Sequence, residues 1–363
     1  MLIILPLLSF KCFAASPIDE LYKQFNVDDL INAIPDETTT IYEELFSDEI
    51  TIEKFISLTP NQLYQAAIEQ VYKYIEQYRV KLFSVISAVL IMALLGGVWE
   101  NGTQNKVYDL ICVLSITAIL ITPILNCISH GCSSIKDITK FMTAYIPVYA
   151  SVMTASGSVS AAAFYQTVVF AASQIINHIS ISFFMPMLHV YMLVSLSGVI
   201  SKNNGIISLC EGVKKLITWG LTLISTVFTG ILSFHSIYGT AVDSAFSKTA
   251  KFLIGSFVPI IGSAFSDALT AVNSSIKIIK AAVGGFGVAI AAISFMPVLI
   301  NITILRIIIW FIKITGETLA VSQAKNILSG FSNVLSIITA LILTTIMLLV
   351  ISTAIMMTTA VSR

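Results

Sequence analysis

S182-F-F-M-P-M-L188 and I293-S-F-M-P-V-L299 are nearly identical apolar phrases, each interrupted by proline, in a chain of 363 residues. A second pair of phrases precedes them, because Pro147 in F141-M-T-A-Y-I-P-V148 aligns with Pro259 in G255-S-F-V-P-I260. A short polar stretch and a long apolar segment then close each half, at 217–238 and 334–357. Four landmarks in the same order favour an internal duplication over chance resemblance between apolar segments.

The composition around these phrases is that of a membrane protein. Hydrophobic residues make up 56% of the chain and charged residues 11%, with a mean hydropathy of +0.90, whereas soluble domains carry about 25% charged residues. The formal net charge is zero, but 13 of the 20 acidic residues and only four basic residues fall within 17–80. Two regions in different solvents are therefore expected.

The N-terminal residues predict a secreted, helical start. Residues 1–15 read MLIILPLLSFKCFAA, an apolar run that is too short to span a bilayer comfortably and that ends in small residues. We interpret it as a signal peptide, with an uncleaved anchor as the alternative. Residues 16–80 show apolar positions at helical spacing and predict an acidic helical extracytoplasmic domain. Its last helix, beginning at Pro60, is expected to continue into the membrane.

The remainder predicts an all-α fold: a polytopic transmembrane helical bundle with internal duplication and proline-broken helices. Residues 81–130 are expected to form two transmembrane helices, followed by membrane repeat 1 at 131–240 and membrane repeat 2 at 241–363. We expect seven to ten crossings. Lysines flank both ends of the apolar segments, so the orientation of the two repeats stays open.

The candidate pathway or interface residues are the four prolines and two charged side chains. Broken segments at matching positions of duplicated halves point to a shared central pathway, so Pro147, Pro186, Pro259 and Pro297 are expected to face inward. The charged candidates are Asp267 and Arg306. Asp267 is interpreted as a polar contact in the pathway or at a subunit interface, or alternatively as a surface residue. Arg306 either pairs with Asp267 or extends its stem to the headgroups.

Other polar positions receive ordinary structural interpretations. Lys277 and Lys280 are expected on one solvated helical face. The glycine cluster G284-G-F-G287 is not followed by a Lys-Ser or Lys-Thr pair, so it is no phosphate loop, and it predicts close helix packing or a helix break. The five cysteines lie mostly in apolar stretches without paired spacing and are expected to be packing residues. No catalytic, cofactor or metal site is predicted, and no nucleic-acid partner is expected.

The order of these landmarks resembles the stage III sporulation protein AE family of endospore-forming bacteria. The most specific stretch is F257-V-P-I-I-G-S-A-F-S-D-A-L269 followed by S275-I-K-I-I-K-A-A-V-G-G-F-G287. The proline, glycine and polar residues that match the family's pattern in this stretch are Pro259, Gly262, Ser266, Asp267, Lys277 and Lys280. The family offers no catalytic residue to carry over.

The resemblance implies a membrane component of the assembly that connects mother cell and forespore. It implies a place in the mother-cell membrane surrounding the forespore, beside other membrane proteins, a separate ATPase and ring-forming subunits. The hypothesis is therefore that the protein is a non-enzymatic platform or pore in a multiprotein channel complex. Within that complex, several copies of the chain can form a homo-oligomer. Two alternatives stay open, namely a self-sufficient secondary transporter for a small metabolite and a non-conducting scaffold.

Overall fold

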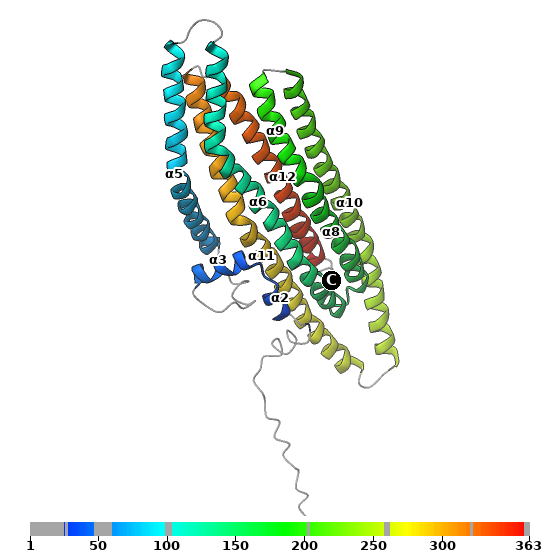
Figure 1. Cartoon of the computed structure of the whole chain (residues 1–363). Helices are drawn as coiled ribbons and strands as arrows, with labels where there is room; N and C mark the ends of the chain where they lie inside the picture. The colour runs from blue at the N-terminus through cyan, green and yellow to red at the C-terminus, as the bar shows by residue number, and fades with distance from the viewer. Residues whose placement is uncertain are drawn as a thin grey trace, which may run out of the picture.

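The computed structural model describes residue 25 and residues 28–46, 60–98, 104–201, 204–257, 262–319 and 322–358. These residues form an elongated, antiparallel helical bundle without strands in the described ranges (Figure 1). The predicted signal peptide and Pro259 lie outside the described residues. The all-α bundle predicted from composition is confirmed.

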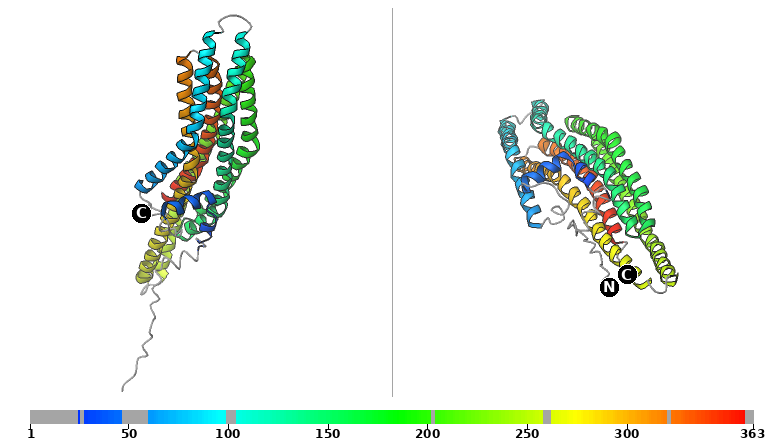
Figure 2. Two further views of the ribbon diagram at one scale, coloured as in Figure 1. Left: turned by 60° about the vertical axis from the view of Figure 1, so that its left-hand side comes forward. Right: turned by 90° about the horizontal axis from the view of Figure 1, so that it is seen from below.

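The chain runs alternately up and down the bundle (Figures 1 and 2). Two short helices, α2 and α3, come first. One ascending pass consists of five elements, namely the helices α7, α8 and α9 and the two π-helical turns between them, η1 and η2. The elements are α2 (Asp28–Asn32), α3 (Asp36–Phe46), α5 (Pro60–Val98), α6 (Gln104–Ala155), α7 (Val159–Phe164), η1 (Tyr165–Val169), α8 (Phe170–Ile179), η2 (Ser180–Phe184), α9 (Met185–Ser201), α10 (Asn204–Phe257), α11 (Gly262–Thr318) and α12 (Ser322–Thr358).

Six helical segments of the described chain are long and apolar enough to cross a membrane. This is fewer than the seven to ten crossings expected from the sequence. The expectation counted 107–128 and the segment around Pro147 separately, but α6 is one helix of 52 residues that contains both. The segment around Pro259 includes residues 258–261, which lie outside the described residues.

The prolines do not break the helices in the way expected. Pro147 lies inside continuous α6 and Pro297 inside continuous α11. Pro186 is the second residue of α9, directly after the π-helical turn η2. A proline ring clashes with the carbonyl four residues earlier, and a wider turn at that point relieves the clash. Packed neighbouring helices allow a helix to continue past a proline.

The N-terminal helices pack against the bundle. The Thr38 hydroxyl on α3 lies 2.6 Å from the Ser294 hydroxyl on α11. Leu30 and Tyr42 are fully buried and belong to the same hydrophobic core as α6, α11 and α12. Helix α5 starts at Pro60, as predicted, and continues through the expected domain boundary at residue 80 without interruption.

The glycine cluster of α11 allows a close approach in the core. A Cβ atom on Gly287 would overlap the Tyr145 ring of α6, and one on Gly284 would lie 2.7 Å from Met357 of α12 and 3.2 Å from the Tyr149 hydroxyl of α6. Tyr145 and Tyr149 are fully buried and stack on each other with ring centroids 5.5 Å apart. The glycines therefore admit two tyrosines between α6 and α11, which is close packing rather than a helix break.

The direction of the helices is compatible with the predicted repeat. Each candidate half ends in an ascending pass followed by a descending one, first α7 to α9 with α10, then α11 with α12. The aligned prolines, Pro186 and Pro297, both lie on ascending passes. Such halves would be parallel rather than inverted. The duplication itself stays a prediction.

Gly287→Ala should destabilise the bundle, because the added methyl group overlaps the Tyr145 ring. Overpacking of this kind costs about 1–3 kcal/mol. The matched control is Gly285→Ala, since nothing lies within 4 Å of a Cβ at that position, and alanine is the better helix former. Thermal unfolding in detergent should show a lower midpoint for Gly287→Ala only. Equal midpoints for both variants would contradict this packing.

Candidate functional site

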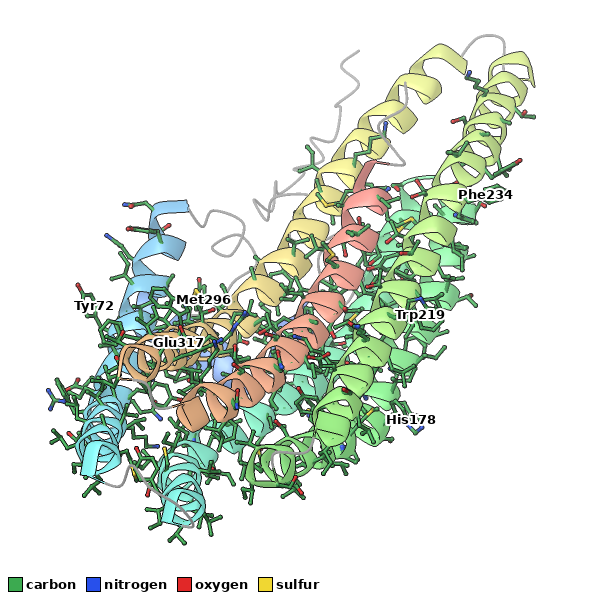
Figure 3. All side chains as sticks on the ribbon, turned by 90° about the horizontal axis from the view of Figure 1, so that it is seen from above. Tyr72, His178, Trp219, Phe234, Met296 and Glu317 are labelled. Atoms are coloured by element: carbon green, nitrogen blue, oxygen red, sulfur yellow. The ribbon has the colours of Figure 1, made fainter. Side chains whose placement is uncertain are left out.

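The outer face of α10 carries exposed apolar side chains from Leu209 to Val242. Within this face, the row from Trp219 to Tyr238 is bounded by aromatic residues, and we infer that it faces lipid (Figure 3 labels Trp219 and Phe234). The two ends are 19 residues apart in sequence, or roughly 28 Å along a helix, which is close to the hydrocarbon thickness of a bilayer. Aromatic residues at both ends are typical of membrane interfaces. The row is Trp219, Leu223, Val227, Ile231, Phe234, Ile237 and Tyr238.

Contacts between helices show which residues of α12 and α6 lie at the same height as the lipid-facing row of α10. The Lys214 ammonium on α10 donates to the Asn333 side chain on α12 over 2.6 Å. Because both helices descend from there, Val227 lies about level with residue 346 of α12. A Cβ on Gly131 of α6 would meet Ile338 and contact Ile342. The segment 131–149 of α6 therefore lies beside the apolar segment 334–357 of α12.

Helix α6 carries polar side chains on its outer face at this level. Lys136 and Lys140 are exposed, and Asp137 is half-buried and accepts a hydrogen bond from the Ser133 hydroxyl over 3.2 Å. Lys136 lies about level with Val227, near the middle of the lipid-facing row of α10. We call the exposed polar positions of α6 between residues 122 and 143 the α6 polar stripe: Thr122, Asn126, Ser129, His130, Ser133, Lys136, Lys140 and Thr143.

The sequence interpretation missed this stripe. Residues 129–140 interrupt the apolar run of α6 and were assigned to the start of a repeat instead of the centre of a helix. The available signal was the charged triplet Lys136, Asp137 and Lys140 between two apolar segments. Ionisable residues inside a spanning helix cost roughly 2.5–3.5 kcal/mol each on insertion scales and so point to a functional position.

A cluster of hydroxyl groups lies inside the bundle near its lower membrane boundary. The Tyr145 hydroxyl donates to the Val283 carbonyl over 3.3 Å, and the Tyr165 and Thr353 hydroxyls are 3.3 Å apart. The Tyr149 ring meets the Tyr165 ring edge-on, and its buried hydroxyl has no hydrogen-bond partner among the described residues. These side chains come from α6, η1, α11 and α12. They place polar groups where the two candidate halves meet.

A charged group closes the lower end of this interior. The Asp243 carboxylate of α10 accepts hydrogen bonds from the backbone N–H groups of Ser160 (3.0 Å) and Ala161 (3.3 Å) at the start of α7. It also attracts the Lys280 ammonium of α11, which the Lys277 ammonium repels. The carboxylate therefore joins α10 to the start of the α7–α9 pass through two hydrogen bonds.

Lys280 corrects one sequence prediction. Lys277 is exposed, as expected, but Lys280 is 2% exposed and lies within the core. Residues three positions apart on a helix differ by about 60° around the axis. The pair consequently straddles the edge of the solvated face instead of sharing it.

Asp267 and Arg306 are not partners within this chain. Both lie on the continuous helix α11, and their separation of 39 residues in sequence corresponds to roughly 59 Å. Arg306 is exposed and lies five residues beyond Asn301, towards the upper end. This position suits a guanidinium group that reaches the headgroups. Asp267 lies on α11 about 25 Å beyond Gly284, outside the level of the lipid-facing row.

The aligned prolines lie in different environments. Pro297 is buried and Pro147 is half-buried, but Pro186 is exposed on α9. Pro186 therefore does not point into the core of the described bundle. The pathway or interface role of Pro147, Pro186 and Pro297 stays a prediction.

Helix α5 meets α11 just above this level. The Tyr78 hydroxyl donates to the buried Asn301 side chain over 2.6 Å. Beside this contact an apolar groove of about 430 Å³ opens between the two helices, with Arg79 as its charged lining residue. Above Tyr78, the apolar half of α5 continues to Val98.

The described residues hold no group of three or more histidine, cysteine or acidic side chains with metal-binding geometry. Cys112, Cys127, Cys132 and Cys210 are buried, which fits the packing role predicted for them.

The sequence matches one protein family over most of its length. The family model described as stage III sporulation protein AE matches residues 40–360. The chain belongs to this family. A curated relative, the stage III sporulation protein AE of Bacillus subtilis (strain 168), is 25% identical over 201 residues, which cover 55% of this chain and 50% of the relative. The match thus spans about half the length of that relative. No solved structure matches this chain.

The membrane level predicts how deeply individual side chains lie in lipid. The chain has three tryptophans, so a variant that keeps Trp219 alone has Trp99→Phe and Trp310→Phe. In vesicles, its fluorescence should be quenched most by lipids with a nitroxide near the headgroup. The matched variant also has Trp219→Phe and Val227→Trp, and chain-end nitroxides should quench it most. The reverse order would contradict this assignment of the lipid-facing row.

Tyr78→Phe should destabilise the bundle, because it leaves the buried Asn301 carbonyl oxygen without its donor. A buried polar group that loses its partner costs about 1–3 kcal/mol. Tyr72→Phe is the control, since Tyr72 is 69% exposed on the same helix. Chemical unfolding in detergent should separate the two variants. Equal stability would show that the Tyr78 hydroxyl contributes nothing.

Proposed function

We propose that this chain is a membrane subunit of a multiprotein transport apparatus needed for endospore formation, in which it acts as a platform or pore. Family membership supports the role in sporulation. The observation that favours a larger assembly over an isolated bundle is the charged segment of the α6 polar stripe, because exposed Lys136 and Lys140 lie level with the lipid-facing row of α10. A bundle that functioned alone in lipid would gain nothing from such a surface.

The proposal includes a location and partners. The protein acts in the mother-cell membrane surrounding the forespore. The extracytoplasmic N-terminal domain stays a prediction, because Thr38 of α3 contacts Ser294 within the bundle. It works beside other membrane proteins of the same apparatus, ring-forming subunits and a separate ATPase. The ATPase supplies the energy, since the sequence has no phosphate-binding loop.

A secondary transporter is the second candidate. The hydroxyl cluster of Tyr145, Tyr149, Tyr165 and Thr353 favours it, because these polar groups lie between the two candidate halves, where such transporters bind substrate. That protein would move a solute when reconstituted alone. The apparatus subunit would need its partners, and a scaffold would recruit them without conducting.

Deletion of the gene in the source bacterium tests the proposal. We expect sporulation to stop after engulfment, with a loss of heat-resistant spores, and a plasmid copy to restore them. Purified protein in vesicles, tested beside the same protein with its partners, separates the candidate functions. Normal spore counts in the deletion strain would refute the sporulation role. Solute flux by the purified chain alone would favour the transporter instead.

A further inference from the structure

The α6 polar stripe has the spacing of a helix-packing surface. Its positions 122, 126, 129, 133, 136, 140 and 143 follow one another at alternating intervals of four and three residues. This interval keeps side chains along one seam when two helices cross at a small left-handed angle. Every side chain at these positions is exposed in the described chain. The seam therefore has the pattern of a contact surface.

Lipid is an unsuitable neighbour for the centre of this seam. Lys136 lies about level with Val227, which is eight residues from Trp219 and eleven from Tyr238 along the lipid-facing row. The nearer boundary is thus roughly 12 Å away. The four-carbon stem of a lysine cannot extend far enough to place its ammonium fully in water from there. Lys140 lies on the same seam, so two ammonium groups share this problem.

The charges of the seam are self-complementary. Lys136 and Lys140 are positive, and Asp137 lies between them on the same helix. A two-fold axis along the membrane normal places equal levels of two copies opposite each other. Lys136 of one copy would then lie opposite Lys136 of the other, and Asp137 of each copy, one residue away at the edge of the seam, would lie beside the other copy's lysine and offset the repulsion. Ser129, Ser133 and Thr143 are small, and small polar residues let helix backbones approach closely in membranes and add interhelical hydrogen bonds.

We propose that the α6 polar stripe is where this protein binds a second copy of itself within the membrane. The contact removes Lys136, Asp137 and Lys140 from lipid and pairs them with one another. It buries a charged face that no element of the described chain covers. The proposal goes beyond the proposed function, because it holds whether the apparatus conducts or only acts as a scaffold.

Disulfide cross-linking in native membranes tests this contact. The full chain, with its five cysteines replaced, carries Ser133→Cys and is produced without other sporulation proteins. Mild oxidation should give covalent dimers. The matched control is Val227→Cys, which is exposed at nearly the same depth on α10 and should stay monomeric. Serine to cysteine is a small change at an exposed position, so the variant should fold.

Charge substitutions separate pairing from chance collision. Lys136→Glu with Lys140→Glu should lower the dimer yield of Ser133→Cys by about tenfold, because like charges then meet across the contact. Adding Asp137→Lys reverses every sign in the triplet and should restore the yield. Unchanged yields in both variants would overturn the role of the charges.

The remaining outcomes also decide the question. If Ser133→Cys gives no dimer and reacts with a membrane-impermeant thiol reagent, the stripe faces water and the proposal is wrong. If a label there is quenched by chain-end nitroxide lipids as strongly as one at Val227→Cys, the stripe faces lipid and the proposal is equally wrong. Dimers that form only when partner proteins are present would also overturn it.

Discussion

The thickness of the hydrocarbon layer is the constraint on which the rest of this structure depends. A bilayer core is roughly 30 Å thick, and the row from Trp219 to Tyr238 on α10 fits it. The apolar half of α5 does not lie at that level, because Tyr78 contacts Asn301 near the upper boundary and the helix continues upward to Val98. The two apolar zones together extend over roughly 60 Å. No single flat bilayer accommodates both.

This offset explains the unusual distribution of charge. The upper part of α6 packs with α5 and is apolar, while the segment from His130 to Lys140 lies beside the apolar segment of α12 and is polar. The opposite side of the bundle has the reverse order, with Lys214 and Glu211 above the apolar row of α10. One side of the molecule is therefore displaced along its axis relative to the other. A bundle of this kind fits a larger assembly better than it fits lipid alone.

Composition and periodicity were sufficient to predict the all-α membrane bundle and the start of α5 at Pro60, and they left close packing as one of two alternatives for the glycine cluster. These features depend on local sequence, or on the general cost of exposing backbone to lipid. The number of crossings was not predictable, because a proline such as Pro147 reads as a break unless the neighbouring helices are known. The depth of Lys280 and the separation of Asp267 from Arg306 depend on helix register. That register is set by contacts between distant segments.

The two π-helical turns, η1 and η2, affect how the pass from α7 to α9 tolerates inserted residues. Pro147 and Pro186 are 39 residues apart, whereas Pro259 and Pro297 are 38 residues apart. A π-helical turn closes its ring over five residues instead of four, so it accommodates an additional residue without ending the helix. Single-residue insertions between Val159 and Pro186 can thus be absorbed where the helix is already widened. This pass should tolerate length variation that α12, which has no such turn, would transmit to every contact beyond it.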